Sequence, residues 1–239
     1  MTNSALALVM AGMLLSCNPK KAPSEDKPSQ PTSLMPIQGP INYLALGDST
    51  GVGVGARNGG YVVRIFNRVL AARPGSKLLN LCVSGATASD VLEGQLERGL
   101  SSDPNLITVG VGINDIGHGF SVEEFAQNYE KIISTLKDET KARIIVTNIP
   151  DISSAPRIPE FARSEYQRAI IAFNQRLEAI AARYDVTVFD VYSTTREQLP
   201  AHPEFFSDDG FHPSDAGYEL WAEEMWPVIQ RAIGFGLED

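Results

Sequence analysis

Short, continuous apolar runs alternate with segments of helical spacing along most of this chain, and that alternation limits the folds it can adopt. Strands that are buried on both faces read as continuous apolar runs, because helices cover both faces of a parallel sheet. The sequence therefore predicts one α/β domain over residues 41–239, with three layers (α/β/α) around a five-stranded parallel sheet. The predicted strands cover residues 41–47, 78–83, 106–111, 143–148 and 186–191.

Segments of helical spacing separate these runs. Apolar residues recur three and four positions apart in them, which is the pattern of a helix that buries one face. Thr87 with Asp90, and Ser121 with Glu124, also have the spacing of capping boxes, which mark helix starts. The pattern predicts helices over residues 61–72, 87–98, 121–137, 161–184 and 193–199, and a last helix that opens at residue 214.

Residues 1–17 have the features of an export signal. The apolar run from Ala5 to Leu15 is of signal-peptide length and is short for a membrane span. Leu14-Leu15-Ser16-Cys17 resembles the end of a bacterial lipoprotein signal, which implies that Cys17 becomes the lipidated first residue. The bulk of Leu15 and the lack of Lys or Arg in the first ten residues depart from that pattern. Secretion without an anchor, or an uncleaved N-terminus, are the alternatives.

A proline-rich segment follows, from residue 18 to residue 40. Its prolines stand among Ser, Lys, Glu and Asp, with too few apolar residues to offset the entropy cost of ordering. We predict a disordered tether, and a tether between a cysteine and a domain fits a lipid anchor. The expected location is the bacterial cell envelope, as a periplasm-facing or surface lipoprotein, with secretion as the alternative.

Composition argues against several classes of function. The formal net charge is −9, whereas nucleic-acid binders usually carry basic patches. With two cysteines and three histidines, neither a disulfide framework nor a metal site is indicated. The glycine run over residues 51–56 formally matches a dinucleotide fingerprint, but Leu79-Asn80-Leu81 stands where its acidic residue is expected. We expect no cofactor and no metal, and we expect the glycines to let their loop pass close to the substrate.

The first apolar run ends abruptly in Gly47-Asp48-Ser49. A serine in this place lies at the carboxyl end of a strand, where open α/β sheets hold their ligands. Gly-Asp-Ser is also ordinary turn chemistry, so the stretch alone does not decide the matter. The hypothesis that Ser49 is a nucleophile requires a base, a group that orients the base, and donors for an oxyanion.

Four other residues can supply these groups. Gly85 follows the second predicted strand and Asn114 the third, so both share the sheet edge with Ser49. Gly85 offers a backbone N–H and Asn114 a side-chain amide to a tetrahedral oxyanion. Asp209 stands three residues before His212, just ahead of the last helix, so one turn can provide both the base and its orienting carboxylate.

Together these residues resemble the four sequence blocks of the SGNH hydrolases, also called the GDSL lipase and esterase family. The blocks read Gly47-Asp48-Ser49, Gly85, Gly112-Ile113-Asn114-Asp115 and Asp209-Gly210-Phe211-His212, in the order and at the separations of the family. The resemblance implies a flavodoxin-like SGNH hydrolase fold. It also implies that Ser49 is the nucleophile, His212 the base and Asp209 its orienter. The implied oxyanion donors are the N–H groups of Ser49 and Gly85 and the amide of Asn114.

Residues close to these blocks carry less of the chemistry. Thr50 follows the nucleophile where the family often has Leu, a departure that leaves the chemistry untouched. We expect Asp48 and Asp115 to give structural support by holding their turns with hydrogen bonds. His202 also precedes a proline, but Leu199 stands three residues before it, so we expect it to lack an orienting carboxylate.

The resemblance implies a serine ester hydrolase that acts through an acyl-enzyme on acyl esters or lysophospholipids. A carbohydrate O-deacetylase acting on polysaccharide or peptidoglycan is the alternative enzyme, because it would use the same residues. A non-catalytic surface lipoprotein that binds a glycan or a lipid is the alternative of another class. In all three cases we expect the protein to contact the membrane only through the N-terminal lipid anchor, and we expect no nucleic-acid partner.

Overall fold

The computed structural model describes residues 35–235, which belong to one compact unit. Residues 35–40, the end of the predicted tether, contain neither helix nor strand. The predicted signal at residues 1–17, the lipidation of Cys17 and the rest of the tether lie outside the described residues. These predictions, and the cell-envelope location that depends on them, stay predictions.

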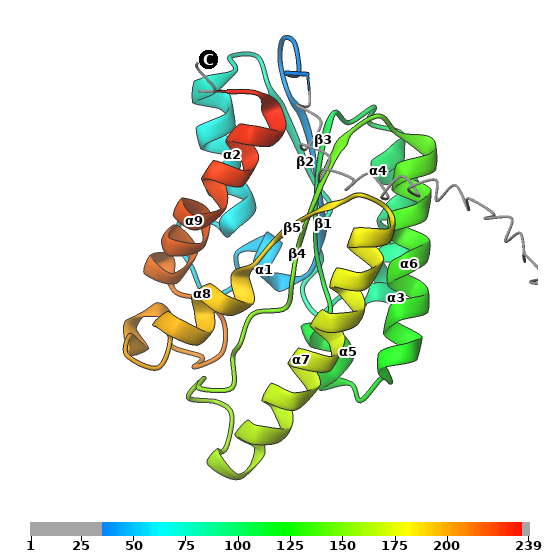
Figure 1. The fold of residues 1–239 in the computed structure, drawn as a ribbon. Helices are drawn as coiled ribbons and strands as arrows, with labels where there is room; N and C mark the ends of the chain where they lie inside the picture. The colour runs from blue at the N-terminus through cyan, green and yellow to red at the C-terminus, as the bar shows by residue number, and fades with distance from the viewer. Residues whose placement is uncertain (1–34, 236–239) are drawn as a thin grey trace, which may run out of the picture. The chain divides into compact units, whose positions relative to one another are not determined.

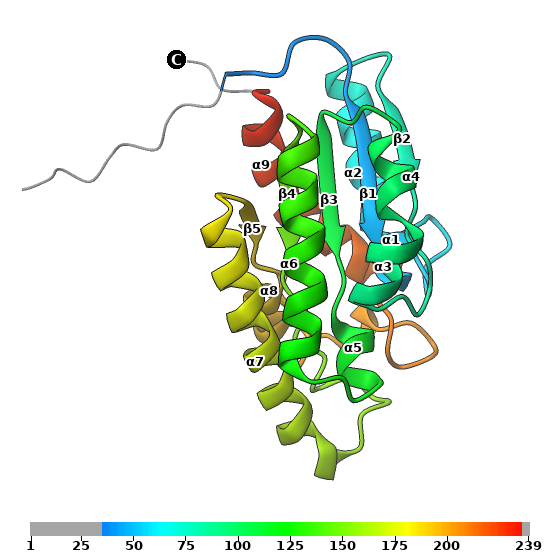
Figure 2. The same cartoon turned by 90° about the vertical axis from the view of Figure 1, so that its right-hand side faces the viewer.

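Five parallel strands form the central sheet, in the order β2-β1-β3-β4-β5 (Figure 2). This is the flavodoxin-like strand order, in which ligands bind at the carboxyl ends of the strands, where the order reverses between the first strand and the third. The predicted fold class is confirmed. The strands are β1 (Asn42–Gly47), β2 (Lys77–Asn80), β3 (Leu106–Gly110), β4 (Arg143–Thr147) and β5 (Thr187–Phe189).

Helices cover both faces of the sheet (Figures 1 and 2). One face carries α2 (Tyr61–Ala72) and α9 (Asp215–Ile233), and the other carries α3 (Ala88–Gly94), α6 (Val122–Glu139) and α7 (Glu160–Arg183). Since successive side chains of a strand point to opposite faces, β1 contributes to both hydrophobic cores. The α2/α9 side buries Tyr43 and Ala45, and the other side buries Leu44 and Leu46.

The two predicted capping boxes are present. The Thr87 side chain accepts a hydrogen bond from the backbone of Asp90, whose carboxylate accepts one in return at 2.9 Å. Ser121 and Glu124 repeat the arrangement at the start of α6. The helix predicted over residues 87–98 is broken, however: α3 ends at Gly94, and α4 (Leu96–Leu100) begins two residues later. Gln95 stands at the break.

Three short elements escaped the sequence patterns, because one turn of helix holds too few residues to show a period. Two of them begin at or beside predicted site residues, which places Ser49 and Asn114 at helix starts rather than in open loops. The three short elements are α1 (Ser49–Val52), α5 (Ile113–Gly117) and the 3-10 helix η1 (Pro203–Phe205).

The helix predicted over residues 193–199 is α8 (Val191–Gln198), which starts two residues earlier than predicted.

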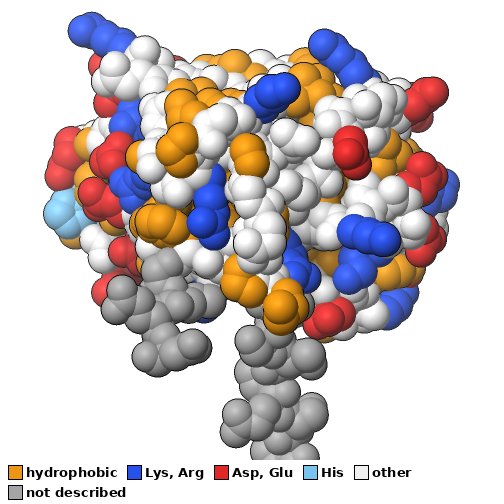
Figure 3. Space-filling model, turned by 90° about the horizontal axis from the view of Figure 1, so that it is seen from above, with side chains coloured by type: hydrophobic (Ala, Val, Ile, Leu, Met, Phe, Trp, Pro, Cys, Tyr) orange, Lys and Arg blue, Asp and Glu red, His pale blue; other side chains and the backbone are white. Residues whose placement is uncertain are grey.

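The amino ends of the strands lie at the opposite edge of the sheet from the three short helices. On this face of the described chain, basic and acidic side chains are interspersed with apolar ones (Figure 3). None of the helices within residues 35–235 is both long enough and apolar enough to cross a membrane.

Candidate active site

Ser49, His212 and Asp209 form a continuous hydrogen-bonded chain. The Oγ of Ser49 lies 3.0 Å from the Nε2 of His212, and the Nδ1 of His212 lies 2.5 Å from an Oδ of Asp209. An ionised carboxylate can only accept, so Nδ1 carries the proton of the neutral ring and Nε2 is the acceptor that faces the serine hydroxyl. The structure thus brings together the three residues that the sequence nominated for nucleophile, base and orienter.

The turn that carries Asp209 and His212 holds itself in shape. One Oδ of Asp209 accepts from the backbone N–H groups of Phe211 and His212, at 2.8 and 2.9 Å, and from the Ser207 hydroxyl at 2.9 Å. Partial burial opposes ionisation of the carboxyl. The hydrogen bonds from the His212 ring, the two N–H groups and Ser207 outweigh it and hold the pKa of Asp209 well below its usual range. Asp209 therefore remains ionised beside the ring.

Ser49 is the first residue of α1, and the residues on either side of it hold it there. The Asp48 carboxylate caps the helix by accepting from the N–H of Thr50 at 2.9 Å and from its hydroxyl at 2.8 Å. These hydrogen bonds are of the kind predicted for Asp48, and Thr50, where the sequence departs from the family pattern, supplies both of them. Burial raises the pKa of Asp48 to about 6, although these bonds act against the shift.

The loop that carries Gly85 is tied to the segment after β3. The Asn114 side-chain amide donates to the carbonyl of Ala86 at 3.0 Å, which leaves its second N–H for another acceptor. Both carboxylate oxygens of Asp115 accept from the N–H of Ala88, at 3.1 and 3.2 Å, which ties the segment after β3 to the start of α3. Gly85 itself has a φ of +83°, a conformation that favours glycine.

Gln95 is a site residue that the sequence patterns did not reveal. It is 3 % exposed, and its side chain makes two hydrogen bonds of 2.8 Å with Gly47, one to the N–H and one to the carbonyl. The same carbonyl accepts from the N–H of Val83 at 3.0 Å. Gln95 therefore contacts the strand end that leads to Ser49, at a carbonyl shared with the segment that leads to Gly85. A polar residue in an ordinary helical stretch carries no sequence signal of this kind.

The glycine-rich loop packs against the histidine turn. Gly55 has a φ of +92°, and a Cβ at this position would lie 2.7 Å from both the Pro213 carbonyl oxygen and the Ser207 hydroxyl oxygen. The hydroxyl of Tyr218 on α9 also donates to the Val54 carbonyl at 3.0 Å. The structure thus gives this loop a packing role within the protein, beside His212, rather than the substrate contact expected of its glycines.

His202 does have a carboxylate beside it, so that expectation was wrong. Its Nδ1 lies 2.9 Å from an Oε of Glu204, which stands two residues after it instead of three before. Both side chains are substantially exposed, at 43 % and 60 %. The pair lies on the surface, and His212 is the histidine that faces Ser49.

Within the part of the chain that the structure describes, no three His, Cys, Asp or Glu side chains are grouped so that they could hold a metal ion. The arrangement around Ser49 has instead the parts of a nucleophilic hydrolase: a hydroxyl, an imidazole that accepts its proton, and a carboxylate that orients the imidazole.

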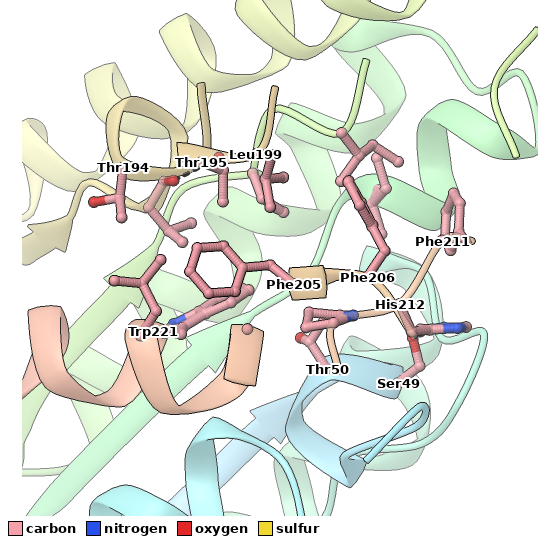
Figure 4. Close-up of a pocket in the computed structure, with 17 residues that line it drawn as sticks. Ser49, Thr50, Thr194, Thr195, Leu199, Phe205, Phe206, Phe211, His212 and Trp221 are labelled. Carbon is pink, nitrogen blue, oxygen red and sulfur yellow. Dashed lines mark hydrogen bonds between the residues drawn. The ribbon is translucent and has the colours of Figure 1, made fainter. Parts of the chain in front are cut away.

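A pocket opens beside Ser49 and His212 (Figure 4). The labelled side chains place Ser49 and His212 at one end and Thr194 and Trp221 at the other, with Phe205 between them. Its walls come from α8, η1, the start of α9 and the segments that follow β3 and β4. The apolar side chains in the lining are those of Ile113, Pro150, Ile152, Val191, Leu199, Phe205, Phe206, Phe211, Pro213, Leu220 and Trp221.

The chain matches the model of the GDSL-like lipase/acylhydrolase family over residues 45–220. It belongs to this family. The matched range contains every residue predicted for the site except Cys17, and the expectation of an enzyme that hydrolyses ester bonds is confirmed at the level of the family.

Two curated relatives are similar in sequence to this GDSL family member over most of their length. An acetylxylan esterase of Geobacillus stearothermophilus is 24 % identical over 192 residues, which cover 76 % of this chain and 84 % of the relative. The spore germination lipase LipC of Bacillus licheniformis is 26 % identical over 220 residues, which cover 82 % and 97 %. The two relatives are named for different kinds of substrate.

Solved structures resemble this GDSL family member in fold. The lipase/acylhydrolase of Enterococcus faecalis has a TM-score of 0.65 at 23 % identity, covering 80 % of this chain and 95 % of its own. The acetylxylan esterase Axe2 of Geobacillus stearothermophilus has a TM-score of 0.66 at 23 % identity, covering 84 % and 97 %. At such identities the likeness concerns the α/β fold.

Proposed function

We propose that this protein hydrolyses carboxylic esters through a Ser49–His212–Asp209 triad and an acyl-enzyme. The observation that carries the proposal is the 3.0 Å contact between the Ser49 hydroxyl and His212 Nε2, with Asp209 bound to the other ring nitrogen. Membership of a family of ester hydrolases supports the same reaction.

In the first step, Ser49 Oγ attacks the ester carbonyl carbon while His212 Nε2 takes the hydroxyl proton. The tetrahedral intermediate collapses when the bond to the alcohol oxygen breaks, and His212 returns the proton to that oxygen. In the second step, water gives a proton to the same nitrogen and attacks the acyl-enzyme, which releases the acid and restores Ser49. Asp209 stays ionised and stabilises the imidazolium that forms in each step.

Three donors serve the negative charge that develops on the carbonyl oxygen in this mechanism. They are the N–H groups of Ser49 and Gly85 and the second N–H of the Asn114 amide. Ser49 is the first residue of a helix, where N–H groups have no partner inside the helix. Asn114 uses one N–H to bind Ala86, which fixes the direction of the other. Such prearranged donors stabilise a transition state more than a ground state.

Active-site labelling tests this proposal directly. A p-nitrophenyl alkylphosphonate should release one p-nitrophenolate per protein and attach to Ser49, and ester hydrolysis should disappear in proportion. The Ser49→Ala protein should neither react nor hydrolyse. Labelling elsewhere, or ester hydrolysis that survives in Ser49→Ala, would refute the triad.

A carbohydrate O-deacetylase is the second candidate enzyme. The observation in its favour is the similarity to an acetylxylan esterase, although that similarity is 24 % identity. It would use the same triad, so the two candidates differ only in the ester that they accept. Rates on acetylated xylan or peptidoglycan fragments, compared with rates on simple alkyl esters, separate them.

A non-catalytic lipid- or glycan-binding protein remains the candidate of another class. The continuous hydrogen bonds from Ser49 to Asp209 argue against it, because a binding site has no need of an oriented imidazole beside a serine. A folded protein that binds such ligands but reacts with no phosphonate would decide in its favour.

A further inference from the structure

The pocket beside Ser49 differs in chemistry from a site for a sugar. Its polar groups are the side chains of Ser49, His212 and three threonines and the buried indole N–H of Trp221, and no Asp, Glu, Lys, Arg, Asn or Gln of the described chain lines it. Sugar hydroxyls that leave water need hydrogen-bond partners, and each one without a partner has a free-energy cost. Apolar walls instead favour a chain of methylene groups, which gains free energy as it leaves water.

We propose that this pocket binds the acyl chain of the substrate, and that the enzyme prefers esters of unbranched aliphatic acids longer than acetate. This inference rests on the proposed function, because it assumes that Ser49 forms the acyl-enzyme. It assigns chain-length selection to apolar residues of the lining, among them Leu199, which lies beside Phe205, and Trp221 on α9 (Figure 4).

The order of the two chemical steps decides which part of the ester occupies the pocket. The alcohol leaves after the first step, and water must then reach the carbonyl carbon next to His212 from the side that the alcohol vacated. The acyl group stays bound to Ser49 through both steps. A pocket with apolar walls is a poor route for water but a suitable place for a group that stays. The alcohol is therefore assigned to the solvent side.

Two matched series of esters test the assignment on the unaltered enzyme. In the first series the leaving group is p-nitrophenolate and the acid grows from acetate to decanoate. In the second the acid is acetate and the alcohol grows by the same steps. Each buried methylene contributes about 0.8 kcal/mol, so kcat/KM should rise roughly fourfold per methylene along the first series until the pocket is full. The second series should stay flat.

Substitutions of Leu199 test which wall sets the limit. Leu199→Trp should reduce the ratio of kcat/KM for the preferred chain to that for acetate, and Leu199→Ala should move the preferred length upward. Glu197 is exposed on the same helix and does not line the pocket, so Glu197→Trp is the matched control and should leave the ratio as it is. A ratio compares two esters on one protein preparation, so partial misfolding does not change it.

The outcomes separate this inference from the proposed function. Highest activity on acetate in the first series would overturn the acyl assignment while ester hydrolysis through Ser49 stands. A rise along the alcohol series alone would place the alcohol in the pocket and also overturn the assignment. A ratio that Leu199→Trp and Leu199→Ala leave unchanged would overturn the role of Leu199. Absence of hydrolysis of any ester would count against the proposed function itself.

A second inference concerns Gln95, and it stands on a separate observation. Its side chain occupies the break between α3 and α4, and it binds the N–H and the carbonyl of Gly47 at 2.8 Å each. Gly47 lies two residues before Ser49. Val83, which donates to the same carbonyl at 3.0 Å, lies two residues before Gly85.

We infer that Gln95 is a positioning residue for the oxyanion site. By binding the Gly47 peptide groups, it sets the spacing between the two backbone segments that present the N–H groups of Ser49 and Gly85. It touches neither substrate nor the triad. A small displacement of either donor weakens the hydrogen bonds that matter only in the transition state, so kcat should suffer more than KM.

Gln95→Met keeps the length of the side chain and removes both hydrogen bonds. We expect kcat to fall about tenfold to a hundredfold, with KM changed by less than roughly twofold. Rates are to be divided by the phosphonate-titrated concentration of active sites, which removes any loss due to unfolded protein. The control is Gln127→Met at an exposed position of α6, which should match the parent protein.

A double-mutant cycle with Asn114→Ala completes the test. If both residues act on one oxyanion site, the two costs in kcat should combine to less than their product. Costs that multiply fully, or a fall in rate that vanishes after correction for active sites, would overturn the positioning role. So would a fall that appears in KM and leaves kcat unchanged.

Discussion

The two sides of the serine are built in different ways. On one side, Asp209 and His212 share a turn that carries most of its own hydrogen bonds, from the Ser207 hydroxyl and the backbone of Phe211 and His212. On the other side, Ser49, Gly85 and Asn114 come from the ends of three different strands. They are held by contacts between distant segments, such as Asn114 to Ala86.

The histidine side therefore depends mainly on local hydrogen bonds, whereas the other side depends on tertiary contacts. The hydrogen bonds that hold the Asp209 carboxylate span at most three positions, although the turn also accepts a hydrogen bond from the N–H of Arg157 at the carbonyl of Gly210, at 2.9 Å. The oxyanion side needs the sheet, the α3/α4 break and the Asp115 contact to Ala88 to be in place first. Substitutions of Asp209 therefore act on hydrogen bonds that the turn makes within itself. Substitutions on the oxyanion side combine effects on chemistry and on packing.

The largest effect is expected at Ser49, where the two sides meet. Ser49→Ala removes the nucleophile, and kcat should fall on the order of 10⁴- to 10⁶-fold, as it should in His212→Ala. Steady-state hydrolysis of an aryl ester measures the loss. Ser134→Ala, on α6 and away from the site, should keep full activity. Parent-like turnover in Ser49→Ala would mean that some other group is the nucleophile.

Asp209→Asn tests the local side alone. An amide in this place allows the imidazole to adopt the wrong tautomer, so kcat should fall by roughly 10³- to 10⁴-fold, and loss of the ionised carboxylate should also lower the thermal stability. The neighbouring Asp208, which is exposed, offers a matched control in Asp208→Asn. A kcat equal to that of the parent protein would show that Asp209 does not orient His212.

Asn114→Ala tests the tertiary side. Removal of the amide should cost about 3 kcal/mol of transition-state stabilisation, which is a fall in kcat on the order of 10²-fold. Loss of the hydrogen bond to Ala86 should also lower the unfolding temperature. Asn128→Ala on α6 is the control for a change of the same size. An unchanged kcat would remove Asn114 from the oxyanion site.

The smallest effect concerns stability and pH at Asp48. Burial raises the pKa of this carboxyl to about 6, so the folded protein binds a proton that the unfolded chain, with a pKa of 3.8, has already lost. Asp48 should therefore make the parent protein less stable as pH rises from about 4 to about 6. Asp48→Asn carries no charge at any pH.

The quantity to measure is the free energy of urea unfolding of Asp48→Asn minus that of the parent. It should increase between pH 4 and pH 6, by on the order of 2–3 kcal/mol, and level off above pH 6. Asp138→Asn at an exposed position of α6 should show no such increase. A difference that stays constant over this range would mean that the Asp48 carboxyl titrates as it does in the unfolded chain.

Sequence reasoning placed the five strands and the long helices within a few residues, and it named Ser49, Asp209 and His212, which the structure brings into contact. These features depend on short-range rules. A strand that is buried on both faces has a continuous apolar sequence, and the buried face of a helix repeats every three or four residues. A carboxylate three positions before an imidazole is close enough to contact it.

Only the tertiary structure decided the rest. Gln95 interrupts a regular helical stretch because its side chain turns inward to Gly47, which lies 48 residues away. The apolar pocket is likewise shared by α8, η1 and α9, and Leu199 lines it at the end of α8. Neither feature repeats along the chain. Each depends on contacts between segments that are distant in sequence, and the periodicity of a local sequence does not predict such contacts.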